Sequence, residues 1–265
     1  MKILYSLLIL LIPFLATTIG SASVIFFKKD KMNPNIEKIC EGLAAGVMLA
    51  AAIFGLLMPA LEYEVSYMPN ILLVILAFIL GVILLLVIDH LVPHFHIEGN
   101  YDEGPQSHIS KMNKMFLAVL IHNIPEGLSV GIALGLALNQ ITTDNITIAA
   151  FASTLSLSIG IAIQNIPEGA VVSLPIKAST GSRKKGFLFG FLSGAVEPIF
   201  GVIGLLLAFY IESLMPWALA LAAGAMFYVT IEDLIPNAVE NSKHHLGIIS
   251  FIVGFLLMMS LDYLL

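Results

Sequence analysis

Charged residues are scarce in this sequence, and cysteine is nearly absent. Only 11% of its 265 residues are charged, whereas 58% are hydrophobic and the mean hydropathy is +0.98. A soluble domain carries about 25% charged residues, so the composition indicates a polytopic protein of the lipid bilayer. The single cysteine, Cys40, excludes an internal disulfide and a cysteine-based zinc site. The net charge of −6 argues against a nucleic-acid partner.

Eight apolar stretches each come near the ~20 residues that a membrane-spanning helix needs. They cover residues 3–27, 36–61, 71–90, 112–138, 146–176, 186–211, 214–237 and 246–265. The connections are short except for 91–111 and 177–185, which leaves no room for a separate soluble domain. The sequence therefore predicts an all-α membrane protein with eight transmembrane helices, folded as a single transmembrane domain over residues 1–265.

The positive charges predict the orientation of these helices, because they favour the cytoplasmic side. Ten of the twelve Lys and Arg residues lie in or beside the connections after the first, third and fifth stretches: Lys28, Lys29, Lys31, Lys38, Lys111, Lys114, Lys177, Arg183, Lys184 and Lys185. We therefore expect a multi-pass protein of the cell membrane with both termini outside. The charges after the first stretch also favour an uncleaved span over a signal peptide, which is the alternative.

One six-residue phrase occurs twice. Residues 122–127 read His-Asn-Ile-Pro-Glu-Gly and residues 164–169 read Gln-Asn-Ile-Pro-Glu-Gly, 42 residues apart (164 − 122 = 42). Positions i and i+4 share one face of a helix, so His122 and Glu126 point the same way, and the second copy repeats this spacing. The phrases place six polar side chains on two neighbouring helices: His122, Asn123, Glu126, Gln164, Asn165 and Glu168.

Carboxylates in mid-membrane need a counter-charge. Each costs roughly 2.5–3.5 kcal/mol on insertion scales, and Glu197, beside a proline in the sixth stretch, adds a third to Glu126 and Glu168. No Lys or Arg lies near them in the apolar stretches, so the counter-charge is a bound cation, protons or both. Imidazole, carboxylate and amide ligands suit Zn²⁺, Fe²⁺, Mn²⁺ or Cd²⁺. The alternative, two proline kinks with protonated structural glutamates, is disfavoured by the matched copies.

Further candidate ligands lie outside the repeated phrases. Met48 could add a thioether to the site, although methionine mostly serves packing. Acidic residues stand at several helix ends, where they are either solvated or serve as metal transfer sites: Glu62, Asp89, Glu232, Asp233 and Asp262. The segment 91–111, expected in the cytoplasm, is rich in acids and histidines. It either binds exchanging metal, with His90, His94 and His96, or is a flexible polar loop.

The paired phrases on the fourth and fifth of eight helices resemble those of the ZIP (Zrt-, Irt-like protein) metal transporters. The layout is similar to the GufA-type and ZupT-type prokaryotic members. The resemblance implies a 3+2+3 bundle, in which helices 1–3 and 6–8 are related by inverted pseudo-symmetry. It also implies that the acids at the helix ends occupy places similar to the transfer sites of relatives.

The resemblance further implies a site for two metal ions. The first would be held by five residues, namely Met48, His122, Glu126, Gln164 and Glu168. The second would be held by Asn123, Glu126, Asn165, Glu168 and Glu197, with Glu126 and Glu168 bridging the two ions. Asn165 stands where some members of the family have an aspartate, which removes one negative charge from the second position.

These observations predict a transporter that moves zinc, and also iron, manganese or cadmium, into the cytosol by alternating access. Three ionised carboxylates and one divalent ion leave a charge of −1, so we expect metal binding to release protons and uptake to depend on pH. A passive channel with the same residues is the main alternative. An intramembrane metal-dependent hydrolase is less favoured, because the sequence lacks His-Glu-x-x-His. The sequence is compatible with a homodimer.

Overall fold

The structure is a computed structural model that describes residues 2–26, 33–63, 67–96, 101–140, 151–210, 214–239 and 245–265. The described part contains eight helices long and apolar enough to cross a membrane, which confirms the predicted all-α membrane fold. Several parts of the expected spans and of the expected cytoplasmic segments lie outside the described residues: 27, 97–100, 146–150 and 211, together with Lys28, Lys29 and Lys31.

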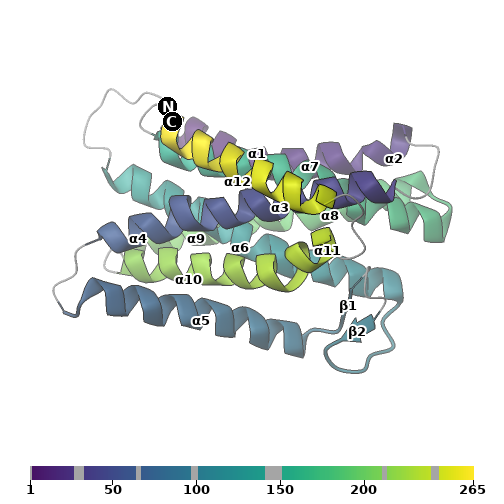
Figure 1. Ribbon diagram of the computed structural model, residues 1–265, viewed down its shortest axis with the longest axis horizontal. Helices are drawn as coiled ribbons and strands as arrows, with labels where there is room; N and C mark the ends of the chain where they lie inside the picture. The colour runs from purple at the N-terminus through teal and green to yellow at the C-terminus, as the bar shows by residue number, and fades with distance from the viewer. Residues whose placement is uncertain are drawn as a thin grey trace.

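Four of the eight spans consist of more than one helical element. In chain order the spans are α1 (Lys2–Ser21) with α2 (Ser23–Phe26); α3 (Pro34–Ala50), η1 (Ala51–Leu57) and α4 (Met58–Glu62); α5 (Asn70–Leu91); α6 (Lys111–Gln140); α7 (Ala152–Thr180); α8 (Arg183–Gly194) with α9 (Val196–Tyr210); α10 (Met215–Val229), η4 (Thr230–Leu234) and α11 (Ile235–Val239); and α12 (Leu246–Leu264). Helix α1 begins and α12 ends at the same end of the bundle (Figure 1).

Local sequence signals explain several of the helix ends. Asn33 caps α3 by accepting a hydrogen bond from the Asn35 N–H at 2.9 Å, and Pro34 fills the first helical position. Helix α7 ends at Gly181, whose φ of +64° is a left-handed conformation that glycine adopts without strain. Ser182 then caps α8 by accepting from the Lys185 N–H at 3.3 Å.

Apolar side chains cover the outside of the bundle as well as its core. On α5, the buried residues recur every three or four positions, as Leu73, Ala77, Gly81 and Leu85 show, and isoleucines and leucines between them are exposed. A helix that is apolar on all faces suits a core on one side and lipid on the other.

The helices pack mainly in four pairs, which are α1 with α7, α6 with α9, α3 with α12, and α5 with α10. If the first span is exchanged with the sixth, the second with the seventh, the third with the eighth and the fourth with the fifth, each of these pairs becomes another of the four. This is the pairing that a 3+2+3 arrangement would produce, and the inverted repeat itself stays a prediction.

The 91–111 segment contains a short hairpin rather than a helix. Strand β1 (His94–His96) pairs antiparallel with β2 (Tyr101–Glu103), with His94 opposite Glu103. The hairpin connects α5 to α6 and lies against α6 (Figure 1). It places the first part of the histidine-rich segment at the end of the bundle where α11 also lies.

Two spans contain a π-helical turn, η1 in the second span and η4 in the seventh. Each is followed by a proline, Pro59 or Pro236, which lacks the N–H that would bond four residues back. In η4, the Ile235 N–H bonds instead to the Thr230 carbonyl, five residues earlier. The extra residue turns the following side chains round the helix, and such turns are frequent at functional sites.

Candidate metal site

The structure brings the side chains of both repeated phrases together. They lie on α6 and α7, and α9 adds Glu197 while α3 adds Met48. Six of these eight side chains are at most 2% exposed, namely Met48, Asn123, Glu126, Gln164, Asn165 and Glu197. His122 and Glu168 are partly buried, because they face a cavity.

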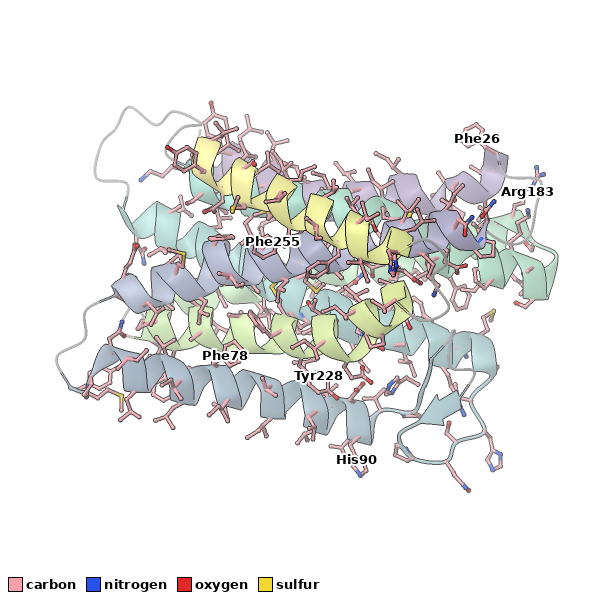
Figure 2. All side chains as sticks on the ribbon, viewed as in Figure 1. Phe26, Phe78, His90, Arg183, Tyr228 and Phe255 are labelled. Atoms are coloured by element: carbon pink, nitrogen blue, oxygen red, sulfur yellow. The ribbon has the colours of Figure 1, made fainter. Side chains whose placement is uncertain are left out.

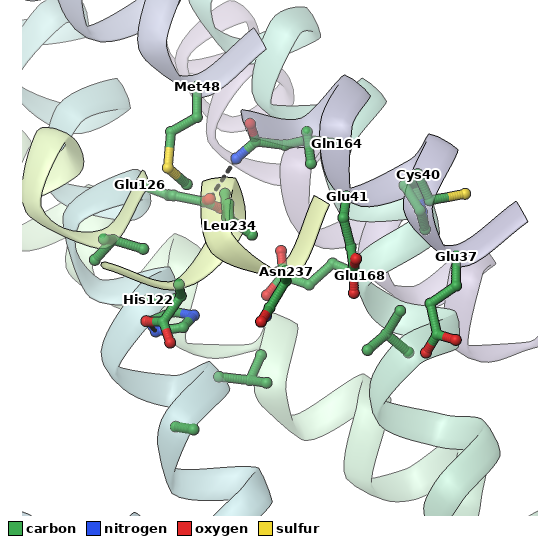
Figure 3. A pocket seen from close by; sticks show the side chains of 17 residues that line it. Glu37, Cys40, Glu41, Met48, His122, Glu126, Gln164, Glu168, Leu234 and Asn237 are labelled. Carbon is green, nitrogen blue, oxygen red and sulfur yellow. Dashed lines mark hydrogen bonds and ion pairs between the residues drawn. The ribbon is translucent and has the colours of Figure 1, made fainter. Parts of the chain in front are cut away.

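That cavity, of about 120 Å³, contains the candidates for the first metal position. Met48, His122, Glu126, Gln164 and Glu168 all line it (Figure 3). The Gln164 amide nitrogen donates a hydrogen bond to Glu126 Oε1, which ties the two repeated phrases together. The cavity is continued by residues that sequence reasoning had not selected as ligands: Glu37, Cys40 and Glu41 of α3 and Asn237 of α11.

The candidates for the second position lie beside the first. Asn123 Nδ2 donates to the Ser193 carbonyl at 3.0 Å and lies 3.5 Å from Glu197 Oε1. The Asn165 amide interacts with the carboxylates of both Glu126 and Glu197. Glu126, Glu168 and Glu197 are close enough to repel one another electrostatically. The three carboxylates therefore lie near enough to affect one another's charge, and their joint role as ligands stays a prediction.

A proline beside Glu197 and a glycine on the facing helix explain how Glu197 reaches this cluster. Pro198 has no N–H to donate to the Gly194 carbonyl, and α8 ends at Gly194, so α9 begins with Glu197 in its first turn. On the facing helix, a Cβ at Gly127 would lie 2.4 Å from the Glu197 carbonyl oxygen. Only glycine at the end of the first phrase lets α9 pack this closely against α6.

Six buried oxygen atoms of this cluster make no hydrogen bond within the part of the chain that the structure describes. They are Asn123 Oδ1, Glu126 Oε2, Gln164 Oε1, Asn165 Oδ1, Glu168 Oε1 and Glu197 Oε2. Buried polar atoms are normally paired, and unpaired ones are costly. All six are acceptors that lie among like atoms, so a proton or a cation is the partner that would satisfy them.

The histidine of the first phrase has a partner that the sequence did not reveal. His122 Nε2 lies 2.6 Å from Asp233 Oδ2, on η4 of the seventh span. The sequence left Asp233 open as a solvated helix-end acid or a metal transfer site, and the structure shows that it is 6% exposed and lines the cavity. Within the described ranges, no group of three or more His, Cys, Asp or Glu side chains is arranged so that these residue types alone could hold a metal ion.

The candidates near the end of α5 include one acid and three histidines. Asp89 accepts from the Tyr228 hydroxyl at 2.9 Å, and its other oxygen lies 3.0 Å from His94 Nε2. Tyr228 points toward the end of α5, whereas His90 is exposed and points away from the bundle (Figure 2). For His96 the structure gives only its place on β1.

The remaining acids differ in their distance from the cavity. Glu232 lies beside Asp233 on η4. Glu62 and Asp262 lie at the ends of α4 and α12, at the other end of the bundle (Figure 1), and neither lines the cavity. Sequence reasoning also missed Thr17 of α1, whose hydroxyl donates to Glu197 Oε1 at 2.8 Å. No motif marks Thr17, because its position depends on how α1 packs.

Comparisons with known proteins agree with this arrangement. The model of the ZIP Zinc transporter family matches residues 115–262. Zinc transporter ZupT of Chlorobaculum parvum is 35% identical over 272 residues, which cover 97% of this chain and 96% of that protein. ZupT of Streptococcus mutans is 34% identical over 250 residues, 90% of each chain.

A human relative matches over a shorter region. Zinc transporter ZIP11 of Homo sapiens is 42% identical over 164 residues, which cover 62% of this chain and 46% of the human protein. The chain thus spans less than half the length of that relative, but nearly the whole length of the ZupT proteins. With the family match and the eight spans, these likenesses show that the chain belongs to the ZIP zinc transporter family and is a membrane transporter rather than an enzyme.

Proposed function

We propose that this protein carries Zn²⁺ across the cell membrane into the cytosol through the site on α6, α7 and α9. The observation that carries the proposal is the cluster of six buried oxygens without hydrogen-bond partners in the described part of the chain. A dication placed among them would offset the repulsion of the three carboxylates. The relatives that match nearly the full chain are named zinc transporters, which supports the choice of metal.

The donors favour two metal positions of different character. Around the cavity, Met48 and His122 supply a thioether and an imidazole beside the oxygens of Glu126, Gln164 and Glu168. Because His122 Nε2 faces Asp233, Nδ1 is the nitrogen left for a metal ion. This set suits Zn²⁺ and Cd²⁺, whereas the all-oxygen second position would also suit Fe²⁺ or Mn²⁺.

The second position would be formed by Asn123, Asn165 and Glu197, with Glu126 and Glu168 shared between both ions. Two glutamates that bridge two dications keep the formal charge near balance. With Asn165 neutral, the three carboxylates and two dications give a charge of +1 (−3 + 4 = +1). We therefore expect the second ion to bind more weakly than the first.

The charge distribution supports a cavity that opens toward the cytoplasm. Lys243 follows the seventh span, so of the twelve Lys and Arg residues only Lys2 falls on the far side of the membrane. The cavity is lined by Glu37, Cys40 and Asn237, at the ends of spans that adjoin the positively charged connections. The cavity thus faces the side that the positive charges assign to the cytoplasm, with both termini outside.

Packing on the other side of the cluster favours a carrier over a continuous pore. Leu134 of α6 and Leu157 of α7 are at most 1% exposed and belong to the hydrophobic core beyond Glu126 and Gln164. An ion would reach the site from outside only after these helices had moved. This supports alternating access, with the cytoplasmic side open in the present structure.

The test is ⁶⁵Zn uptake into proteoliposomes that contain the full chain. Glu126→Gln and Glu168→Gln remove charge while keeping shape, and each should reduce uptake at least about tenfold, because loss of even a residue that only orients a ligand costs about 10–100-fold. Thr18→Val changes a residue of α1 that belongs to neither ligand set and should keep near-native uptake. Undiminished uptake in both glutamate variants would rule out the proposed site.

A further inference from the structure

Glu197 is held by a helix that contributes no residue to either proposed ligand set. Its Oε1 accepts from the Thr17 hydroxyl of α1 at 2.8 Å, with Asn123 Nδ2 further away at 3.5 Å. Its Oε2 makes no hydrogen bond in the described part of the chain. One oxygen of this carboxylate is therefore fixed, and the other is left as an acceptor within the cluster.

Thr17 reaches Glu197 only because two glycines leave room for α1. A Cβ at Gly169, the last residue of the second repeated phrase, would lie 2.2 Å from the Thr17 carbonyl oxygen. A Cβ at Gly194 would lie 2.7 Å from the Thr17 Cβ. Thr17 is consequently 0% exposed, and the pocket around it fits the threonine side chain closely.

The two repeated phrases use their glycines in corresponding ways. Gly127 of the first phrase lies against α9 at Glu197, and Gly169 of the second phrase lies against α1 at Thr17. Thr17 thus holds, beside the second phrase, the place that Glu197 holds beside the first. A charged ligand and a neutral donor occupy the two equivalent places, and they bond to each other.

A simpler role for Thr17 would be local. Threonine hydroxyls in helices often bond to the carbonyl four residues back, and Thr17 Oγ1 does lie 3.3 Å from the Pro13 carbonyl. The neighbouring Thr18 shows the ordinary case, since its hydroxyl donates to the Phe14 carbonyl at 2.9 Å. For Thr17 the shorter contact is the one to Glu197, so its single proton goes to the carboxylate.

We propose that Thr17 is a positioning residue for Glu197, and that its hydroxyl group strengthens binding of the second metal ion. The inference rests on the proposed function. A hydrogen bond that orients a metal ligand typically contributes a factor of about 10–100 in affinity. Thr17 fixes the orientation of the carboxylate and leaves Oε2 for the ion, whereas a side chain without a hydroxyl leaves the carboxylate to its weaker contacts with the amides of Asn123 and Asn165.

The experiment is a zinc titration of the full chain in detergent, which resolves the stepwise dissociation constants. Thr17→Val keeps the shape of the side chain and removes the hydroxyl, Thr17→Ser keeps the hydroxyl, and Thr18→Val makes the same change on the adjacent residue. Glu197→Gln identifies the binding step that belongs to the second position. Melting temperatures without zinc report whether the variants fold alike.

The expected result is two zinc-binding steps in the native chain, with the step that Glu197→Gln abolishes weakened about tenfold by Thr17→Val. In Thr17→Val, the dissociation constant of the other step should stay within about a factor of three of the native value. In Thr17→Ser and Thr18→Val, the dissociation constants of both steps should stay within the same range. The proposal is overturned if Thr17→Val leaves the dissociation constant of the second step unchanged, or if Thr17→Ser weakens that step as much as Thr17→Val does. It is also overturned if the native chain shows only one zinc-binding step. If Glu126→Gln leaves every step unaltered, the proposed function itself fails.

Discussion

The imidazole of His122 lies 2.6 Å from the carboxylate of Asp233, which joins the first repeated phrase to the π-helical turn of the seventh span. Metal-binding histidines are commonly oriented in this way, by a carboxylate that accepts from the second ring nitrogen. The contact therefore connects the proposed ligand to an acid of the seventh span that also lines the cavity.

The first prediction concerns this pair. Asp233→Asn should weaken the tighter zinc-binding step by about 10–100-fold, because the imidazole loses its orienting partner. His122→Ala should weaken it at least as much. The double variant should be scarcely worse than His122→Ala, since the two residues act together. Zinc titration in detergent measures all three, and additive losses would mean that Asp233 acts independently of His122.

The second prediction concerns the close approach of α6 and α9. Gly127→Ala would bring a Cβ within 2.4 Å of a backbone oxygen of Glu197, and the backbone cannot move aside as a side chain can. Overpacking of this kind costs about 1–3 kcal/mol, so the melting temperature in detergent should fall.

A matched control for this glycine lies on η1. A Cβ at Gly55 would lie 3.2 Å from Leu157 Cδ1, the end of a flexible side chain. Gly55→Ala should therefore melt close to the native temperature. Equal melting temperatures for the Gly127 and Gly55 variants would argue against the tight α6–α9 contact.

The third prediction concerns the bond that holds α1 against α7. Pro13 has no N–H for the Ile9 carbonyl, and the Ser158 hydroxyl donates to that carbonyl at 2.7 Å. Ser158→Ala should destabilise the protein by about 1 kcal/mol, because it leaves a buried carbonyl unpaired. On the same helix, Ser156 Oγ is buried and makes no bond in the described part of the chain.

Ser156→Ala is therefore the control, and it should have little effect or a small stabilising one. Thermal unfolding of both variants in one detergent gives the comparison. The prediction is wrong if Ser158→Ala unfolds at the same temperature as Ser156→Ala or the native chain, because the hydroxyl of Ser158 would then contribute nothing through the Ile9 carbonyl.

The fourth prediction uses the single cysteine to test the orientation. Cys40 lines the cavity and is half-buried, so a small thiol reagent can reach it from the side on which the cavity opens. A membrane-impermeant maleimide should label the protein in inside-out vesicles and leave it unlabelled in intact cells. Cys40→Ser provides the background. Efficient labelling in intact cells would reverse the proposed topology.

The spans and the ligand-bearing faces could be predicted because each depends on short-range patterns. An apolar run of sufficient length gives a span, and the i, i+4 spacing brings Glu126 to the face of His122 wherever the helix lies. The clustering of Glu197 with these residues also follows from charge, since a lone carboxylate in lipid has no other partner. These features need no knowledge of how the helices pack.

The contacts that the sequence did not reveal depend on packing between distant spans. Asp233 was a candidate as a solvated acid or a transfer site but not as the partner of His122, because a regular 3.6-residue period does not predict the π-helical turn that places it there. Thr17 carries no signal of its own, since its role arises from the glycines at 169 and 194 on other helices. The hairpin at His94 likewise depends on its pairing with a later segment.

The central claim is that the carboxylates of Glu126 on α6 and Glu168 on α7 share a dication. Anomalous diffraction at the zinc absorption edge, from crystals of the full chain grown with zinc, tests it most directly. The claim predicts a peak within bonding distance of Glu126 and Glu168, with Met48 or His122 also in contact. A peak elsewhere, with these two glutamates turned apart and no anomalous signal between them, would contradict it.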